Sequence, residues 1–554
     1  PVEHHYIVSE PIEGAHDNLP VGRDPDTQIY FRSEGDAIML GAFQLYSKPW
    51  MVDRIPDDFA FQLLEPDWDK YQQPLEAGQH LIPALKETAF PKFVNGPESF
   101  TPDNNFIMGE APGVSRLFVA AGFNSVGIAS GGGAGKYLAE WIDGGEAPMD
   151  LWSVDIRRFM DWQNNPNYLR NRVTEVLGLH YQMAWPNREF ETARDIRRST
   201  LHERLAERGA CFGSKLGWER PNWFAPVGVT PEMVYSFGKQ NWFDHVGAEV
   251  RATRDNVALF DQSSFAKYLL HGEDALQVLQ RVCGNNIDVS EGQVVYTGMF
   301  NERGTFESDL TVVRLTEQNF YLITSTSQAI RDFDWIFQHI NDGEQADLTD
   351  VTTTYSVLGV MGPQAAVLLG AVGDVDFSQM TFPFGTSQEV AIGPITVGAV
   401  RITYVGESGW ELHIPAEQAG FVYDTLMEAG RAFDLANAGH YAINCMRLEK
   451  AYRAWGADIS PDDTPLEAGL SFAIDWGKNF IGRDALLELR QDPLTKRLAI
   501  FVLQDPGAVL WGNEPILRDG VPVGYTTSGA YGYTLGAAVG MGFIKHADGG
   551  DSAF

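Results

Sequence analysis

Residues 294–315 read VVYTGMFNERGTFESDLTVVRL. The order of apolar, turn-forming and again apolar residues predicts a strand, a tight turn and a second strand. Asp309 heads a β-branched apolar run in the second strand, where the core of a sheet is expected. An ionised carboxylate is costly to bury unless it has polar partners or a chemical task. We therefore take Asp309 as a candidate site residue.

The composition describes a long, acidic, globular chain. Its 554 residues are 44% hydrophobic, and the length alone predicts about three or four domains. Acidic side chains number 74 against 41 basic ones, and the net charge of −33 argues against nucleic acid and anionic membranes as partners. No stretch of about 18 uncharged apolar residues is present to span a membrane. Cys211, Cys283 and Cys445 lie far apart without metal-ligand spacing, so we expect a reducing compartment and no bound metal.

Periodicity divides the first half of the chain into regions. Apolar and polar residues alternate over 28–43 around a central turn, which predicts an antiparallel hairpin. Residues 118–121 predict a short buried strand, followed by a glycine-rich loop over 122–135 and a helix over 136–142. Residues 150–241 lack sustained periodicity, and we interpret them as a connector.

The second half predicts an α+β domain and a small barrel. Two sets of apolar residues recur at helical spacing: Ala275, Val278, Leu279 and Val282, then Ile330, Phe333, Ile336, Phe337 and Ile340. Segments with strand-like composition lie between them. Short apolar runs at 498–502, 521–525 and 537–544 predict a small β-barrel, which we interpret as incomplete where the sequence ends.

The glycine-rich loop is open to two interpretations. Glycines let backbone amides approach a ligand closely, and the following helix directs its N-terminus to the same place, which suits an anionic cofactor edge. The loop is not a P-loop, because Tyr137 follows Gly135-Lys136 and Ser130 replaces the first glycine. A GxGxxG dinucleotide motif is also absent from the sequence. From the glycines alone, structural packing and ligand contact are equally favoured.

Four motifs in order resemble the glycine-cleavage T-protein family. Residues 294–315 resemble the signature segment of that family, and 404–412 (YVGESGWEL), 446–456 (MRLEKAYRAWG) and 464–470 (TPLEAGL) follow in the family's order. The resemblance implies a folate-binding domain in which Asp309 positions or deprotonates the attacking nitrogen of tetrahydrofolate. A carboxylate suits this task because it takes up a proton as the nitrogen forms its new bond.

The same resemblance implies further residues of a folate site. Tyr404 and Glu411 match positions near the folate, and Glu411 offers two acceptor oxygens to the paired N–H donors of the pterin. Tyr296 and Ser325 occupy matching but less specific positions. For Tyr296, packing across the strand pair is the alternative.

Arg447 has two implied roles and one structural alternative. As the arginine of the family's Arg-Leu-Glu motif, it is expected to face a folate carboxylate or to hold the site in shape. The alternative is a buried ion pair with Glu449 or another acid. We interpret Trp410, Trp455 and Trp476 as core residues rather than pterin-stacking residues.

A second resemblance covers the first part of the chain. Residues 95–103 (NGPESFTPD), 108–112 (MGEAP) and the glycine-rich loop resemble the end of the FAD domain in dimethylglycine and sarcosine dehydrogenases. The resemblance implies that the loop lies against the pyrimidine edge of the flavin, where amide donors and the helix dipole stabilise negative charge. The implied FAD-binding residues are Gly122, Asn124, Gly127 and Ile128.

Residues 4–8 (HHYIV) resemble the His-x-Tyr strand of the same dehydrogenases, which implies that Tyr6 is a catalytic residue beside the amine. Without the resemblance, Tyr6 is equally a strand aromatic that is half buried in a sheet. The family's glycine fingerprint for the pyrophosphate, and the histidine that many members join covalently to FAD, have no counterpart in the sequence. We therefore expect FAD to be held only in a full-length parent or together with a companion chain.

The two resemblances imply an α+β multidomain flavoenzyme. The expected domains are the C-terminal part of a DAO-type FAD and substrate domain (1–149), a connector (150–241), a T-protein-like folate-binding α+β domain (242–488) and an incomplete C-terminal β-barrel (489–554). The implied location is the cytoplasm, or the mitochondrial matrix in a eukaryote.

The implied reaction is FAD-dependent oxidative N-demethylation of dimethylglycine, sarcosine or a related N-methyl amine. The one-carbon unit would pass to tetrahydrofolate and give 5,10-methylenetetrahydrofolate, and an electron-transfer flavoprotein or oxygen would accept the electrons. Two alternatives stay open: a flavin-free folate-dependent aminomethyl- or methyltransferase, and a non-catalytic folate-binding subunit.

Overall fold

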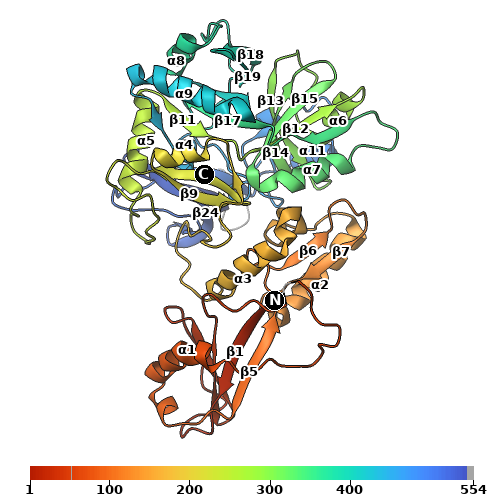
Figure 1. Ribbon diagram of the computed structural model, residues 1–554. Helices are drawn as coiled ribbons and strands as arrows, with labels where there is room; N and C mark the ends of the chain where they lie inside the picture. The colour runs from red at the N-terminus through yellow and green to blue at the C-terminus, as the bar shows by residue number, and fades with distance from the viewer. Residues whose placement is uncertain (52, 546–554) are drawn as a thin grey trace. The chain divides into compact units, whose positions relative to one another are not determined.

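The computed structural model describes residues 1–51 and 53–545 (Figure 1). The chain divides into two compact units, Pro1–Arg194 and Asp195–Phe554, and each is described by itself. Among the described residues, no helix combines the length and the apolar composition needed to cross a bilayer.

The first unit is built on a five-stranded sheet. Its strand order is β2 (Gly22–Asp24), β3 (Ile29–Glu34), β4 (Ala37–Ala42), β1 (Val2–Val8) and β5 (Lys92–Glu98). Strands β3 and β4 pair antiparallel from Ile29 opposite Ala42 to Glu34 opposite Ala37, so the predicted hairpin is confirmed. Helix α1 (Trp68–Leu81) and the short η1 (Pro83–Lys86) contribute Tyr71 and Leu85 to the core on this sheet.

A two-stranded sheet and two helices complete the first unit. These are β6 (Ile107–Glu110), β7 (Phe118–Ala121), α2 (Gly127–Gly144) and α3 (Pro166–Leu179), with short turns η2 (Trp152–Val154), η3 (Ile156–Arg158) and η4 (Asp161–Asn164). The predicted strand at 118–121 is confirmed, but the prediction that it is buried is wrong: Ala120 and Ala121 are exposed, since among the described residues β7 pairs with β6 alone.

Helix α2 begins earlier than the sequence predicts. We expected a loop up to residue 135, whereas the helix starts at Gly127 and includes the whole glycine run. Glycine costs about 1 kcal/mol relative to alanine in a helix, which weakens a helix without forbidding it. The prediction was wrong because it treated several glycines as a break.

The second unit begins inside the region interpreted as a connector. A three-stranded sheet has the order β8 (Arg197–Arg198), β10 (Trp218–Phe224), β9 (Ala210–Lys215), and helices α4 (His202–Glu207) and α5 (Phe243–Asp255) accompany it. Short strands and a short helix explain why no periodicity was visible over these residues.

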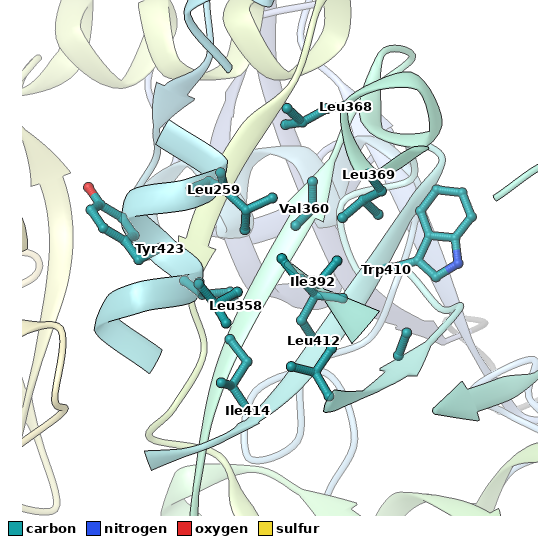
Figure 2. Packing of buried hydrophobic residues seen from close by; sticks show 14 of the residues in the cluster. Leu259, Leu358, Val360, Leu368, Leu369, Ile392, Trp410, Leu412, Ile414 and Tyr423 are labelled. Atoms are coloured by element: carbon teal, nitrogen blue, oxygen red, sulfur yellow. The ribbon is translucent and has the colours of Figure 1, made fainter. Parts of the chain in front are cut away.

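A six-stranded sheet forms the largest core of the second unit. Its order is β18 (Ser387–Ile392), β19 (Ile395–Val400), β20 (Gly409–Pro415), β17 (Tyr355–Met361), β11 (Ala258–Asp261) and β21 (Ala436–Asn437). One face packs against helices α8 (Ala365–Val372) and α9 (Ala419–Gly430). Figure 2 shows the residues of this face: Leu259, Leu358, Val360, Trp410, Leu412 and Ile414. Trp410 is fully buried here, as expected for a core residue.

A five-stranded sheet carries residues 294–315. Its order is β13 (Val294–Phe300), β14 (Phe306–Arg314), β15 (Asn319–Thr324), β12 (Ala266–His271) and β16 (Asp347–Asp350). Strands β13 and β14 pair antiparallel, which confirms the predicted strand, turn and strand.

Two helices flank this five-stranded sheet at positions that the sequence predicts. Helix α6 (Ala275–Val282) buries all four residues of the first predicted stripe. Helix α7 (Ala329–Gln338) buries Ile336, but Phe337 is 55% exposed and Ile340 lies beyond the end of the helix. The second stripe is therefore only partly a core face. The short η5 (Thr326–Gln328) precedes α7.

The C-terminal sheet has four strands in the order β22 (Lys496–Val502), β25 (Ala537–Lys545), β24 (Val521–Gly532) and β23 (Pro515–Arg518). The three predicted apolar runs are confirmed as strands. Two further helices of the second unit are α10 (His440–Glu449) and α11 (Arg483–Leu489). Its short turns are η6 (Ala416–Gln418), η7 (Arg431–Phe433) and η8 (Ser471–Ala473).

Candidate functional site

Two sheets of the second unit direct polar side chains toward one another. In β20, Trp410, Leu412 and Ile414 point to the helix-covered face, so the alternation of a strand places Glu411 and His413 on the opposite face. In the five-stranded sheet, the register places Tyr296, Asp309 and Tyr321 on one shared face. A 3.0 Å hydrogen bond between the Tyr321 hydroxyl and His413 Nδ1 joins the two faces. We call these facing polar side chains the polar layer; beside them the two sheets also share an apolar cluster of Val313, Ile323 and Val400.

Asp309 and Tyr296 form one end of this layer. The Tyr296 hydroxyl donates to Asp309 Oδ2 at 2.8 Å, which bridges β13 and β14 through side chains. Burial raises the pKa of Asp309 to about 6, although the hydrogen bond from Tyr296 acts in the opposite direction. A carboxyl group with this pKa is ionised at neutral pH and still binds a proton readily, which is what a general base requires.

A second carboxyl group lies behind Asp309. Asp332, in the first turns of α7, is fully buried and accepts hydrogen bonds from the hydroxyls of Ser308 (2.8 Å) and Thr324. Burial raises the pKa of Asp332 to about 7. Its neighbour Arg331 pairs with Glu307. Helix α7 thereby fixes the two residues that precede Asp309 in β14.

Tyr404 lies close enough to Asp309 for the charge of that carboxylate to help raise the pKa of Tyr404, after the larger effect of burial. Its hydroxyl donates to the backbone oxygen of Arg453 at 2.6 Å. Tyr296 stacks on Phe472 with 6.4 Å between ring centroids, and the Phe472 side chain is 74% exposed. The structure thus brings Tyr296, Asp309 and Tyr404 together, as the sequence analysis expected.

The guanidinium of Arg447 is saturated by partners within the protein. Its Nη1 atom donates to Asp458 at 2.5 Å and to the backbone oxygen of Tyr452 at 3.0 Å. Nε and Nη2 donate to Asn444, and Nη2 also donates to Ser528 at 2.8 Å. The five N–H groups of an arginine are all used in this way.

The acid that pairs with Arg447 is not Glu449. The partner Asp458 is fully buried, whereas Glu449 pairs with Arg254 at 2.9 Å. Arg447 therefore forms the buried ion pair that was the structural alternative, and its acid is Asp458.

Glu411 forms the other end of the polar layer. Gln262 Nε2 donates to Glu411 Oε1 at 3.2 Å, and His413 Nε2 lies 3.8 Å from Glu411 Oε2. Burial raises the pKa of Glu411 to about 7 and lowers that of His413 to about 3, so the imidazole is neutral. Glu411 is thus a buried acid without a cationic hydrogen-bond donor beside it among the described residues.

Ser325 follows β15 and starts the turn η5. Its hydroxyl donates to Gln328 Oε1 at 2.7 Å and lies 3.0 Å from the hydroxyl of Ser327. Since Ile323 is opposite Thr311, Ser325 continues the same face two residues further along, toward Asp309. These hydrogen bonds are local, and they leave its role toward a ligand a prediction.

In the first unit, the predicted FAD-binding residues share a sharp turn before α2. Gly122 has φ +63°, and a Cβ atom there would lie 2.7 Å from Thr101 Cγ2. Asn124 is buried with φ +47°, and its Oδ1 accepts the backbone N–H of Thr101 at 2.8 Å. Gly127 begins α2, whose N-cap residue offers no side-chain cap, and Ile128 is fully exposed. Uncapped helix amides beside an open glycine surface fit the edge of an anionic cofactor.

Tyr6 lies in β1 and is half buried. It packs against a small cluster of Val8, Ala37 and Met39, and Lys92 Nζ lies 5.8 Å from the centre of its ring. Tyr6 is thus a half-buried strand aromatic, and its part in catalysis stays a prediction.

Three site residues were missed from the sequence: Gln262, His413 and Asp332. Each is polar and buried; Gln262 and His413 lie in or next to a strand, and Asp332 lies in helix α7. For His413, the alternation Trp410, Glu411, Leu412, His413 was visible in the sequence and placed it on the face of Glu411. No sequence signal distinguished Gln262 or Asp332 from surface residues.

Family models match four consecutive parts of the chain. Residues 1–141 match "FAD dependent oxidoreductase", and 144–199 match "FAD dependent oxidoreductase central domain". Residues 201–478 match "GCVT N-terminal domain", and 496–553 match "Glycine cleavage T-protein C-terminal barrel domain".

Curated relatives match along nearly the whole chain. It is 41% identical to 4-methylaminobutanoate oxidase (formaldehyde-forming) of Paenarthrobacter nicotinovorans, over 98% of this chain and 66% of the relative. It is 38% identical to the mitochondrial pyruvate dehydrogenase phosphatase regulatory subunit of Mus musculus, over 98% and 63%. It is 35% identical to mitochondrial sarcosine dehydrogenase of Homo sapiens, over 99% and 64%. The chain thus spans just under two thirds of the length of these relatives.

Among solved structures, the aminomethyltransferase T of the glycine cleavage system from Bartonella henselae is similar. The match has a TM-score of 0.53 and 24% identity and covers 63% of this chain and 90% of that protein. At this identity the likeness concerns the fold.

Proposed function

Since the chain belongs to the family that joins an FAD-dependent amine oxidoreductase to a T-protein-like folate domain, we propose that it serves oxidative N-demethylation with capture of the released carbon by folate. The amine would be dimethylglycine, sarcosine, 4-methylaminobutanoate or a related N-methyl amine. In the oxidation, a C–H bond of the N-methyl group breaks and two electrons leave the amine, which becomes an iminium ion. The electrons would pass on to an electron-transfer flavoprotein or to oxygen.

The folate step balances without a further reagent. The iminium carbon forms bonds to N5 and N10 of tetrahydrofolate, and its bond to the amine nitrogen breaks. Of the two protons lost by the folate nitrogens, one stays on the departing amine and one is released. The products are the demethylated amine and 5,10-methylenetetrahydrofolate.

One observation carries the folate part of the proposal: the polar layer between the two sheets has one acid suited to the reacting nitrogens of a folate and another suited to its pterin edge. Asp309, with its pKa raised to about 6, would take up the proton from the attacking nitrogen. Glu411 would accept the paired N–H donors of the pterin. Tyr296 would hold the Asp309 carboxylate in place, and Tyr404 would border the reacting end.

Arg447 is proposed to hold this site in shape. A fully engaged guanidinium has no N–H group to offer a folate carboxylate unless one of its internal partners is displaced. Ser325 is retained as a proposed folate contact on the face of Asp309.

In the first unit, Gly122, Asn124, Gly127 and Ile128 would border FAD, and Tyr6 would border the amine. When bound, FAD supplies the acceptor for the two electrons of the oxidation. The residues of this chain would contribute backbone amides at the start of α2, which stabilise negative charge. We also propose the domain division 1–149, 150–241, 242–488 and 489–554, and completion of the FAD domain by a longer parent or by a companion chain.

The test is an anaerobic titration of the flavin-loaded, full-length protein with dimethylglycine, sarcosine, 4-methylaminobutanoate and glycine betaine in turn. Loss of the oxidised-flavin absorbance with one of the first three identifies the amine, and glycine betaine should have no effect because its nitrogen lacks a lone pair. With tetrahydrofolate present, formaldehyde release should be replaced by 5,10-methylenetetrahydrofolate. Bleaching by no amine in a flavin-loaded protein would reject the proposal.

A non-catalytic role is the second candidate, because one relative is a phosphatase regulatory subunit. That candidate predicts a full-length protein that binds folate and turns over no N-methyl amine. The same titration separates the two proposals.

A further inference from the structure

The Glu411 end of the polar layer contains two buried atoms that lack a hydrogen-bond partner. Among residues 1–51 and 53–545, neither His413 Nε2 nor Gln262 Oε1 finds one. His413 is 4% exposed and Gln262 is 6% exposed. An unpartnered polar group at this depth costs about 1–3 kcal/mol, so two side by side indicate that something else completes them.

The hydrogen-bond character of each atom follows from its neighbours. The buried Tyr321 phenol keeps its proton, since burial raises its pKa well above the usual value, and it can donate to His413 Nδ1. The neutral imidazole then carries its single proton on Nε2, which becomes a free donor. Gln262 donates its amide N–H to the Glu411 carboxylate, which leaves Gln262 Oε1 as a free acceptor.

Within the described part of the chain, no cation donates a hydrogen bond to Glu411. Lys267 is the cation whose charge lowers the pKa of Glu411, after the larger opposite effect of burial. Its ammonium group, however, donates to the backbone oxygens of Ser263 (2.8 Å) and Tyr355 (2.9 Å). Glu411 Oε2 is therefore available to a ligand.

The three groups stand in a fixed order. Gln262 contacts Glu411 Oε1, and His413 approaches Glu411 Oε2, so the carboxylate lies between a free acceptor on one side and a free donor on the other. From Gln262 to His413, the row consists of the acceptor Gln262 Oε1, the two acceptor oxygens of Glu411 and the donor His413 Nε2. A 2-amino-4-oxopyrimidine edge has the complementary row: two hydrogens on the 2-amino group, the N3 hydrogen, and the 4-oxo oxygen.

Two glycines lie opposite residues of this row, and one of them leaves room for the Gln262 amide. Gly359 in β17 is opposite Glu411, and Gly398 in β19 is opposite His413. A Cβ atom at Gly359 would lie 2.3 Å from Gln262 Oε1, so any side chain there would displace the amide. At Gly398, a Cβ atom would meet only His413, at 3.7 Å. The close fit is therefore specific to Gly359.

We propose that His413 and Gln262 extend the proposed Glu411 contact into a three-residue site that recognises the 2-amino-4-oxo edge of a reduced pterin. His413 Nε2–H donates to the 4-oxo oxygen. Glu411 accepts N3–H and one 2-amino hydrogen, and Gln262 Oε1 accepts the other. This inference rests on the proposed folate-binding function and assigns His413 the discrimination at position 4.

The test compares folic acid with 4-aminofolic acid, in which an amino group replaces the 4-oxo oxygen and N3 loses its hydrogen. Their dissociation constants are measured by calorimetry with the whole chain at pH 8, where Glu411 is ionised. His413 then faces a donor and Glu411 faces a lone pair, so wild-type protein should prefer folic acid by about a hundredfold or more. His413→Gln can donate or accept at position 4, so its preference should be about tenfold smaller than that of the wild type, and the part due to Glu411 should remain.

Tyr321→Phe is the second variant, because it keeps the imidazole but removes the hydroxyl that holds the proton on His413 Nε2, and it should lose a similar part of the preference. Tyr423→Phe is the matched control: it removes a buried hydroxyl, bonded to Asn437 at 3.1 Å, on the helix-covered side of the six-stranded sheet. It should keep the wild-type preference.

A preference that is undiminished in both His413→Gln and Tyr321→Phe, or that is absent from the wild type, overturns the inference and leaves folate binding intact. Failure of wild-type protein to bind folic acid and, under anaerobic conditions, tetrahydrofolate rejects the proposed function itself. The two failures are therefore distinguishable.

Discussion

The most decisive stability prediction concerns the charge that faces Arg447. Asp458 is fully buried and accepts three hydrogen bonds: from Arg447, from the backbone of Ala454 at 3.0 Å and from Thr527 at 2.5 Å. The substitution Asp458→Asn keeps the shape of the side chain and removes its charge. It leaves a guanidinium that is 3% exposed without a counter-ion.

Loss of one member of a buried ion pair costs about 3–5 kcal/mol. The effect is best read locally, from hydrogen exchange of the α10 amides. A loss of about 3 kcal/mol corresponds to exchange roughly a hundredfold faster. Glu428→Gln is the matched control, since it discharges the exposed 2.9 Å pair with Arg431. An exposed pair contributes about 1 kcal/mol or less, so the control should change exchange by less than about fivefold.

The same variant decides between the two roles expected for Arg447. If Arg447 holds the site in shape, Asp458→Asn weakens tetrahydrofolate binding. If Arg447 is instead a ligand for a folate carboxylate, release from Asp458 leaves binding unchanged or strengthens it. Unchanged exchange in α10 together with unchanged folate affinity would refute the reasoning about a saturated, structural arginine.

Three further outcomes are expected at the folate site. Asp309→Asn should lower the rate of 5,10-methylenetetrahydrofolate formation by about 10²–10⁴ while tetrahydrofolate affinity changes little, measured by product formation and calorimetry. In the wild type that rate should fall as the pH drops through about 6, and Tyr296→Phe should move this limb to higher pH because the bond that lowers the pKa of Asp309 is lost. Gly359→Ala should weaken folate binding at least tenfold, whereas Gly370→Ala, in α8 with open space around it, should leave binding unchanged. An unshifted pH limb in Tyr296→Phe, or equal affinities in the two alanine variants, would count against the geometry described above.

Much of the fold could be predicted from the sequence where periodicity was strong. The pair β13 and β14, the hairpin β3 and β4, the helix α6 and three C-terminal strands appear where alternation or helical spacing placed them. The family and the fold class that the motifs implied are confirmed by the matches to the oxidoreductase and T-protein models.

The failures have local physical reasons. Helix α2 was shortened because glycine weakens a helical pattern, although tertiary packing around Ala134 and Trp141 is enough to support it. The exposure of β7 depends on how many strands pair with it, and the residues of β7 alone do not reveal that number. The buried ion pair of Arg447 was expected with Glu449 or another acid, and only the identity of that acid, Asp458 eleven residues away, was beyond the sequence pattern.

The site residues also differ in whether the sequence alone reveals them. Asp309 and Glu411 stood out because a carboxylate in an apolar strand needs an explanation. Gln262 became visible only once β11 and β20 were placed on opposite sides of β17, since its amide reaches Glu411 across Gly359.

The measurement that tests the central claim most directly is an anaerobic calorimetric titration of this chain with tetrahydrofolate at several pH values, beside Glu411→Ala. The account predicts one binding site in the wild type whose affinity falls as the pH drops below about 7, where Glu411 takes up a proton, by up to tenfold per pH unit. It predicts binding at least tenfold weaker, without this pH dependence, in Glu411→Ala. Absence of binding in the wild type, or equal affinity and pH dependence in the two proteins, would contradict a folate site between the two sheets.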